Sequence, residues 1–182
     1  PFKETSLIVE ILSKDFGRIA LVAKGARRPK SSLRGMLLPF QSLHATWSGL
    51  QDLKTLHNVD WSNAFLAIEG DALVCGFYLN ELIMRLVPKD DPYPRLYDFY
   101  HKTILALTTN KSLNMILRRF ELRLLQEIGY EVPLKNDIQG SIIDPKKQYF
   151  YHAGSGASDD KQFSNQLVIS GKTLIDMADD NY

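Results

Sequence analysis

The sequence predicts an α+β protein in which a small β-sheet unit is followed by a helical unit. Short apolar runs bounded by turn residues fill the first third of the chain, and from Asp71 onward apolar residues recur at spacings of three and four. With 182 residues, 45% of them hydrophobic and 24% charged, the composition is that of an ordinary globular protein. We therefore expect two domains, residues 1–62 and residues 63–182.

Four strands are expected in residues 1–62. They are Ser6–Leu12, Arg18–Lys24, Gln41–Ser48 and Leu53–Val59. The first two flank a turn and form a hairpin, and an excursion separates the second strand from the third. This pattern indicates a small antiparallel barrel or sandwich. Such a barrel keeps open edges unless another strand closes it, and one missing strand before Pro1 would close it.

Three helices are expected in the second domain. They are Asp71–Val87, Tyr93–Leu107 and Leu113–Ile128. The third has the clearest apolar stripe, and Gly129 stands where a left-handed C-terminal cap is expected. After Pro133 the sequence becomes polar and rich in loop residues, before a short apolar run at Gln166–Ile169 and a helix start after Ser170.

Cysteine content and hydropathy indicate the cellular compartment in which the protein is expected. Cys75 is the single cysteine, which excludes an internal disulfide framework and fits a reducing compartment. No apolar stretch approaches the ~20 residues of a membrane span, and no secretory signal opens the chain. We expect a cytoplasmic protein that does not engage membranes.

Positive charge is concentrated in one stretch of the sequence. Between Phe16 and Gln51 there are six basic residues and no acidic one: Arg18, Lys24, Arg27, Arg28, Lys30 and Arg34. The whole chain carries 22 basic against 21 acidic residues, so the remainder is net acidic. A concentrated positive field on a near-neutral body favours a polyanion ligand, although such a loop can equally be a solvated face.

Catalytic and metal-binding patterns are missing from the sequence. The four histidines lie far apart with no metal-ligand spacing, and Cys75 lies on an apolar helix, where a buried thiol is expected. Asp90 and Asp91 lie beside prolines at a helix boundary, where capping explains them. Gly154-Ser155-Gly156 matches neither a phosphate-binding loop nor a nucleophile elbow. We expect a protein that is not an enzyme and that needs no metal or cofactor.

Several ordered segments resemble the RecO family of bacterial recombination mediators. The most specific is the run Leu21-Val22-Ala23-Lys24-Gly25-Ala26-Arg27. Others, in order along the chain, are Glu4–Val9, Leu33-Arg34-Gly35, Leu37–Phe40, Trp47-Ser48-Gly49 with Leu53–Leu56, Gly76–Leu82, Leu117–Glu121 and Gly129-Tyr130. The resemblance covers the chain to about Tyr130 and is loose beyond it.

The resemblance implies an N-terminal OB-fold barrel, with its first strand missing here, followed by a helical domain. It implies a DNA-binding repair protein, associated with the nucleoid, that anneals complementary single strands without ATP. Such a protein also helps to load recombinase onto strands coated with single-stranded DNA-binding protein. The implied partners are single-stranded and double-stranded DNA, RecR and the acidic C-terminal tail of single-stranded DNA-binding protein. Some relatives carry a four-cysteine zinc module after the Gly-Tyr pair, but residues 131–158 contain no cysteine, so a metal is not expected.

Candidate site residues follow from the charge pattern and the implied barrel. We expect phosphate contacts from seven cations: Arg18, Lys24, Arg27, Arg28, Lys30, Arg34 and Lys54. Trp47 and Phe40 are candidate base platforms, although aromatic residues of a small barrel more often belong to its core. Arg118, Arg119 and Arg123 are candidates for the acidic tail, with pairing to Glu121 and Glu127 on the helix surface as the alternative.

Two other function classes fit the same charge pattern. An RNA-binding OB-fold module would use the same basic loop, and comparison of RNA and DNA affinities separates it from a DNA-binding protein. A basic protein-interaction scaffold would bind no oligonucleotide even at low salt.

Overall fold

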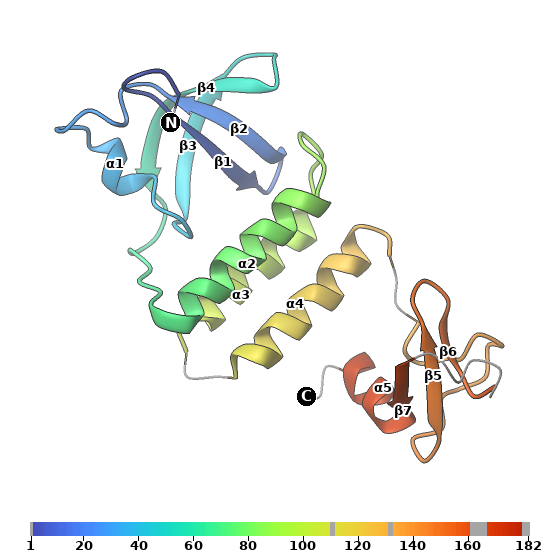
Figure 1. The fold of residues 1–182 in the computed structure, drawn as a ribbon. Coiled ribbons are helices and arrows are strands. Elements are labelled where there is room, and N and C mark those ends of the chain that lie inside the picture. The colour runs from blue at the N-terminus through green and yellow to red at the C-terminus, as the bar shows by residue number, and fades with distance from the viewer. Residues whose placement is uncertain (1, 110–111, 131–132, 161–166, 180–182) are drawn as a thin grey trace. The chain divides into compact units, whose positions relative to one another are not determined.

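A computed structural model describes residues 2–109, 112–130, 133–160 and 167–179 (Figure 1). The chain divides into two compact units, residues 1–120 and residues 121–182. The first contains a four-stranded sheet and helices, as the α+β prediction requires. The predicted boundary near residue 62 separates strands from helices inside this first unit.

The sheet of the first unit has the strand order β1-β2-β4-β3. Its strands are β1 (Leu7–Ser13), β2 (Gly17–Ala23), β3 (Leu43–Ser48) and β4 (Leu53–Trp61). All four lie within two residues of the predicted ranges. The expected purely antiparallel arrangement is wrong, because β2 and β4 pair in parallel. A parallel pair needs a long crossover between its strands, and residues 24–42 together with β3 supply it.

The barrel core is formed by residues that alternate along the strands. Five of its members are buried: Ile19, Leu21, Ala23, Ala26 and Leu56. At one end of the barrel, Gly17 closes the β1–β2 hairpin with a φ of 71°. This left-handed conformation is easy for glycine and strained for other residues, so the turn residue matches its position.

Three helices complete the architecture that the sequence predicts. They are α2 (Gly70–Leu86), α3 (Pro94–Ala106) and α4 (Leu113–Glu127), each within two residues of the predicted bounds. Phe120 is completely buried and packs against Phe99 and Tyr100 of α3, with ring centroids 6.1 Å away in both cases. Within the described residues, no helix has the length and apolarity needed to cross a membrane.

The second unit contains a sheet that the sequence pattern did not predict. Its strands are β5 (Gln148–His152), β6 (Gly156–Ser158) and β7 (Leu167–Ser170), in the order β6-β5-β7, followed by α5 (Gly171–Ala178). Five buried residues form its core: Leu134, Ile143, Tyr149, Ala157 and Leu174. The predicted apolar run agrees with β7 from Leu167 onward, and Gln166 lies outside the described residues. The predicted helix start agrees with α5, which Ser170 caps by accepting a hydrogen bond from the Thr173 amide at 3.0 Å.

Candidate nucleic-acid interface

The basic loop, residues 24–34, consists of tight turns after β2 and the first two residues of the short helix α1 (Leu33–Met36). Gly25 has a φ of 71°, and its carbonyl accepts a hydrogen bond from the Arg28 amide at 3.0 Å. The Arg27 amide donates to the Thr5 carbonyl at 2.9 Å. These bonds fix the backbone, so the side chains leave it in defined directions.

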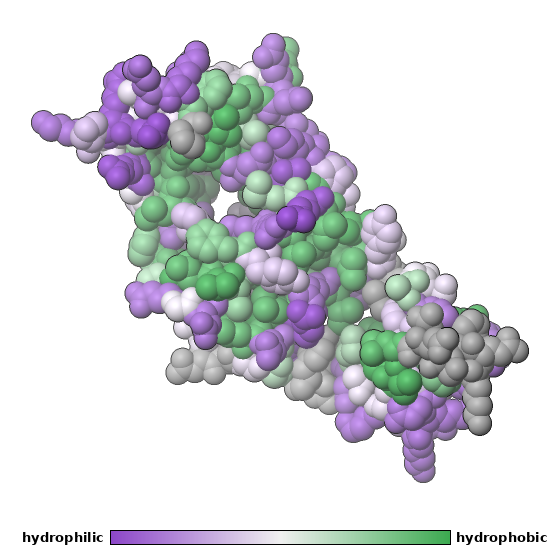
Figure 2. Space-filling view, viewed as in Figure 1, coloured by the Kyte–Doolittle hydropathy of each residue, from purple (hydrophilic) through white to green (hydrophobic). Residues whose placement is uncertain are grey.

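Three apolar residues attach the basic loop to the barrel core. Ala26 is buried in that core, and Leu33 and Leu37 pack against it. These three side chains point inward, whereas the charged side chains of the loop are exposed to solvent. The outward cations are Lys24, Arg27, Arg28, Lys30 and Arg34, all of them exposed. Figure 2 shows hydrophilic surface over this projecting part of the first unit, at the upper left.

These five cations form no ion pair with any residue in the described ranges. Arg27 makes a hydrogen bond instead: its Nη1 donates to the backbone carbonyl of Glu4 at 3.3 Å. A carbonyl leaves the positive charge of the guanidinium uncompensated. The basic loop therefore presents five positive charges to solvent without a carboxylate among them.

The other two predicted phosphate ligands are placed differently. Arg18 is half-buried, with its Nη1 3.1 Å from Glu10 Oε2 and its Nε donating to the Val87 carbonyl at 3.1 Å. Lys54 Nζ lies 2.5 Å from Asp90 Oδ1. Both cations are thus already engaged with carboxylates.

Two more ion pairs occur at the same junction of barrel and helices. Lys89 Nζ lies 3.3 Å from Glu10 Oε1, and Lys14 Nζ lies 2.8 Å from Asp98 Oδ1. The hydrogen bond to Asp98, and then its charge, raise the pKa of Lys14. We call this junction the seam. Its charged members are Glu10, Lys14, Arg18, Lys54, Lys89, Asp90 and Asp98.

The predicted base platforms are largely engaged in packing. Trp47 is half-buried against the barrel core, and the ring of Phe16 meets it edge-on with centroids 5.3 Å apart. The ring centroids of Phe40 and Phe77 of α2 lie 5.2 Å apart. Phe40 also packs over Gly76, where an added Cβ would come within 2.9 Å of the Phe40 ring. Phe16 is 56% exposed at the hairpin tip, so it is an accessible aromatic residue that the sequence reasoning missed.

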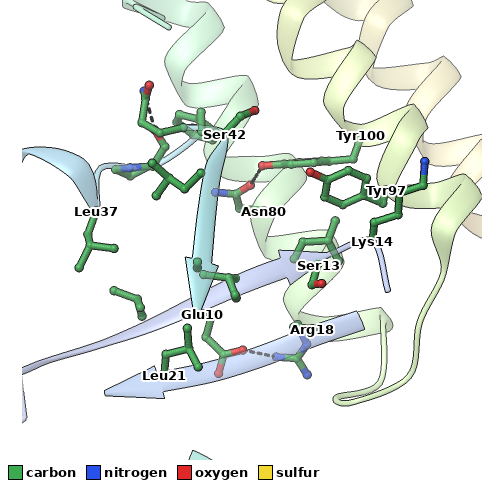
Figure 3. A pocket seen from close by; sticks show the side chains of 18 of the residues that line it. Glu10, Ser13, Lys14, Arg18, Leu21, Leu37, Ser42, Asn80, Tyr97 and Tyr100 are labelled. Atoms are coloured by element: carbon green, nitrogen blue, oxygen red, sulfur yellow. Dashed lines mark hydrogen bonds and ion pairs between the residues drawn. The ribbon is translucent and has the colours of Figure 1, made fainter. Parts of the chain in front are cut away.

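A cavity of about 700 Å³ lies between the sheet and helices α2 and α3 (Figure 3). Both edge strands of the sheet, β1 and β3, contribute to its wall. On the helical side the hydroxyl of Tyr100 donates to Asn80 Oδ1 at 2.5 Å, and burial raises the pKa of that hydroxyl. The cavity therefore coincides with the open side of the barrel.

The three helix arginines lie on α4. Arg123 pairs with Glu127 one turn later, with Nη2 and Oε1 3.0 Å apart, and its Nη1 donates to Gln126 at 3.3 Å. The helix-surface alternative therefore holds for Arg123 in this structure. Arg118 is exposed and Arg119 is half-buried on the same helix.

Other reactive groups do not gather into a site. Within the described residues, no three histidine, cysteine or carboxylate side chains lie close enough together to hold a metal ion. Cys75 is half-buried on α2, less buried than expected, and burial raises the pKa of its thiol. A raised pKa makes the thiolate scarce at neutral pH, which is unfavourable for nucleophilic chemistry.

Comparisons with known proteins cover both units. The family model described as Recombination protein O N terminal matches residues 1–65, and that described as Recombination protein O C terminal matches residues 69–181. The first match contains the basic loop and the whole four-stranded sheet.

Several curated relatives align with the full length of this chain. A DNA repair protein RecO of Nitrosospira multiformis is 47% identical over 185 residues, which span all of this chain and 76% of the relative. One from Burkholderia pseudomallei is 43% identical over 184 residues, spanning 67% of the relative. One from Azoarcus is 45% identical over 183 residues, which span 98% of this chain and 75% of the relative. The resemblance predicted from the sequence is confirmed, and the chain belongs to the RecO family of DNA repair proteins, with an N-terminal OB-fold.

Proposed function

We propose that this chain binds single-stranded DNA through its basic loop and serves as a recombinational repair mediator. One observation carries the proposal: five exposed cations, none paired with a described carboxylate, project from an OB-fold in a chain of the RecO family. An OB-fold binds a strand by tracking its phosphates with cations. Duplex DNA presents the same phosphates, so it is a second ligand of this loop.

The proposed activity is annealing of complementary strands without ATP, followed by help in loading recombinase onto coated strands. Annealing requires two negatively charged backbones to approach each other, and unpaired cations reduce their repulsion. This activity needs proximity and charge neutralisation rather than a catalytic group. The proposed protein partners are RecR and the acidic tail of single-stranded DNA-binding protein. The proposed place of action is the nucleoid.

We assign the acidic tail to Arg118, Arg119 and Arg123 on α4. Charge-assisted hydrogen bonds to carboxylates contribute roughly 1.5–3 kcal/mol each from partly buried arginines such as Arg119 and Arg123, and less from the exposed Arg118. Binding of a tail must then replace the Arg123–Glu127 pair. A pair between side chains one helical turn apart is worth ~0.5 kcal/mol, so the exchange is energetically accessible.

The test compares annealing of bare strands with annealing of strands coated with single-stranded DNA-binding protein, without ATP. The unchanged chain should accelerate both reactions, and Arg27→Ala with Arg28→Ala should slow both. Substitution of all three helix arginines by alanine should slow only the coated reaction, with circular dichroism checking that each variant folds. Absence of any acceleration by the unchanged chain would refute the annealing activity. An unchanged tail affinity in the helix variant would refute the assignment of the tail site.

A further inference from the structure

The α2–α3 loop places a carboxylate on a cation that the sequence assigned to DNA. Lys89 forms a parallel β-bridge with Arg18, and the Asp90 amide donates to the Arg18 carbonyl at 3.0 Å. The loop therefore extends the sheet beside β2, next to the start of β4. This backbone attachment brings the Asp90 carboxylate to Lys54 Nζ.

Asp90 neutralises Lys54 in a cluster where each cation has a carboxylate partner. Glu10 serves both Arg18 and Lys89, with one carboxylate oxygen for each. Lys54 has Asp90 as its carboxylate partner. The side chain of Asp90 is 45% exposed and that of Lys54 is 15% exposed, so Asp90 lies on the solvent side of the ammonium group.

Lys54 lies close enough to the basic loop to meet the same strand of nucleic acid. The parallel pairing sets Lys54 opposite Leu21 of β2. Lys24, the first cation of the basic loop, directly follows the end of β2 at Ala23 and is three residues beyond Leu21, about 10 Å of extended chain. Lys54 and the start of the basic loop therefore lie near each other along the sheet.

We propose that Lys54 is a further phosphate-binding position for a nucleic-acid backbone, and that Asp90 occupies this position in the free protein. The proposal rests on the proposed DNA-binding function and adds a level of control to it. A carboxylate offers the ammonium group the same negative charge and oxygen acceptors that a phosphate offers. A bound strand must displace the Asp90 side chain before it contacts Lys54, and this competition lowers the affinity of the unmodified chain.

Asp90→Asn tests this competition directly. Asp90 has a φ of 55°, and asparagine tolerates the left-handed conformation as well as aspartate does, so the loop should keep its shape. The variant should bind a fluorescein-labelled oligothymidylate about two- to five-fold more tightly at low salt, the factor that matches loss of one ion pair whose carboxylate is solvent-accessible. The salt slope should steepen by roughly 0.7, the value for one added phosphate contact on a single strand.

Asp98→Asn is the matched control, because it removes the same charge from another seam ion pair, that with Lys14. It should leave affinity and slope nearly unchanged, and the comparison thereby separates the effect of Asp90 from that of net charge. Lys54→Ala should have little effect alone and should abolish the gain when combined with Asp90→Asn.

Two results would overturn the inference while leaving the proposed function intact. One is equal binding by the Asp90 and Asp98 variants, and the other is a gain that persists without Lys54. If the unchanged chain and all variants fail to bind the oligothymidylate, the proposed function fails, and this inference fails with it.

Discussion

The basic loop and the seam contain cations of the same types within one compact unit, yet they differ in what surrounds them. Cations of the basic loop have no carboxylate partner among the described residues, whereas Lys14, Arg18, Lys54 and Lys89 of the seam all have one. Unpaired charge is available to a ligand, and paired charge stabilises a junction. We therefore expect the basic loop to supply most of the binding to a polyanion, and the seam chiefly to stabilise the junction of sheet and helices.

Glycine-to-alanine substitutions should show the largest difference in stability between the two regions. Gly17 at the seam has a φ of 71°, and an added Cβ would come within 2.0 Å of the Asp91 carbonyl oxygen. Gly35, beside the basic loop, has open space around it and a φ outside the left-handed region. Gly17→Ala should lower the free energy of unfolding by about 3 kcal/mol or more, from left-handed strain and backbone overlap.

Gly35→Ala should change the free energy of unfolding by less than about 1 kcal/mol, since alanine is the better helix former. Urea unfolding followed by circular dichroism measures both variants. Similar losses in the two would show that the seam is not the tightly packed region described here.

Arg18→Ala should have the next largest effect, on stability rather than on DNA affinity. The substitution removes a half-buried hydrogen bond to the Val87 carbonyl and leaves Glu10 with Lys89 alone. We expect a loss of ~1–2 kcal/mol in the free energy of unfolding and an affinity for single strands within about two-fold of the unchanged chain. A large loss of affinity with unchanged stability would instead place Arg18 in the DNA-binding surface.

The exposed Lys14–Asp98 ion pair of the seam should contribute least to the stability of the fold. The hydrogen bond to Asp98 and its charge raise the pKa of Lys14, so the pair stabilises the fold below the ordinary lysine pKa. This contribution is lost as the pH rises through the raised pKa, in the alkaline range. The small difference in melting temperature between the unchanged chain and Asp98→Asn should therefore be present at pH 8 and shrink as the pH rises above the ordinary lysine pKa. A difference that persists at high pH would require another cause.

Element types were predictable from the sequence because they depend on local periodicity. The three long helices and the four barrel strands follow from spacings of three, four and two. The β5–β6 hairpin was missed because it lies among glycines and polar residues, although the aromatic run Gln148–His152 offered a signal. The anchoring role of Ala26 depends on packing that no spacing reveals.

The partners of the seam cations were beyond the reach of local pattern. Lys54 and Asp90 are 36 residues apart, Arg18 and Val87 are 69 apart, and Lys14 and Asp98 are 84 apart. The sequence predicts Asp90 to be a capping carboxylate at a helix boundary. Its contact with Lys54 becomes visible only when the α2–α3 loop pairs with β2. Charge composition therefore located the basic loop but could not separate available cations from neutralised ones.

The salt dependence of single-strand binding tests the central claim most directly, in two variants that each remove two positive charges. Arg27→Ala with Arg28→Ala changes the basic loop, and Lys14→Ala with Lys54→Ala changes the seam. Each phosphate contact contributes about 0.7 to the slope of log affinity against log salt. The loop variant should therefore lose roughly 1.4 from the magnitude of the slope, while the seam variant should lose less than about 0.7. Equal losses, or a larger loss in the seam variant, would contradict the division between binding and bracing.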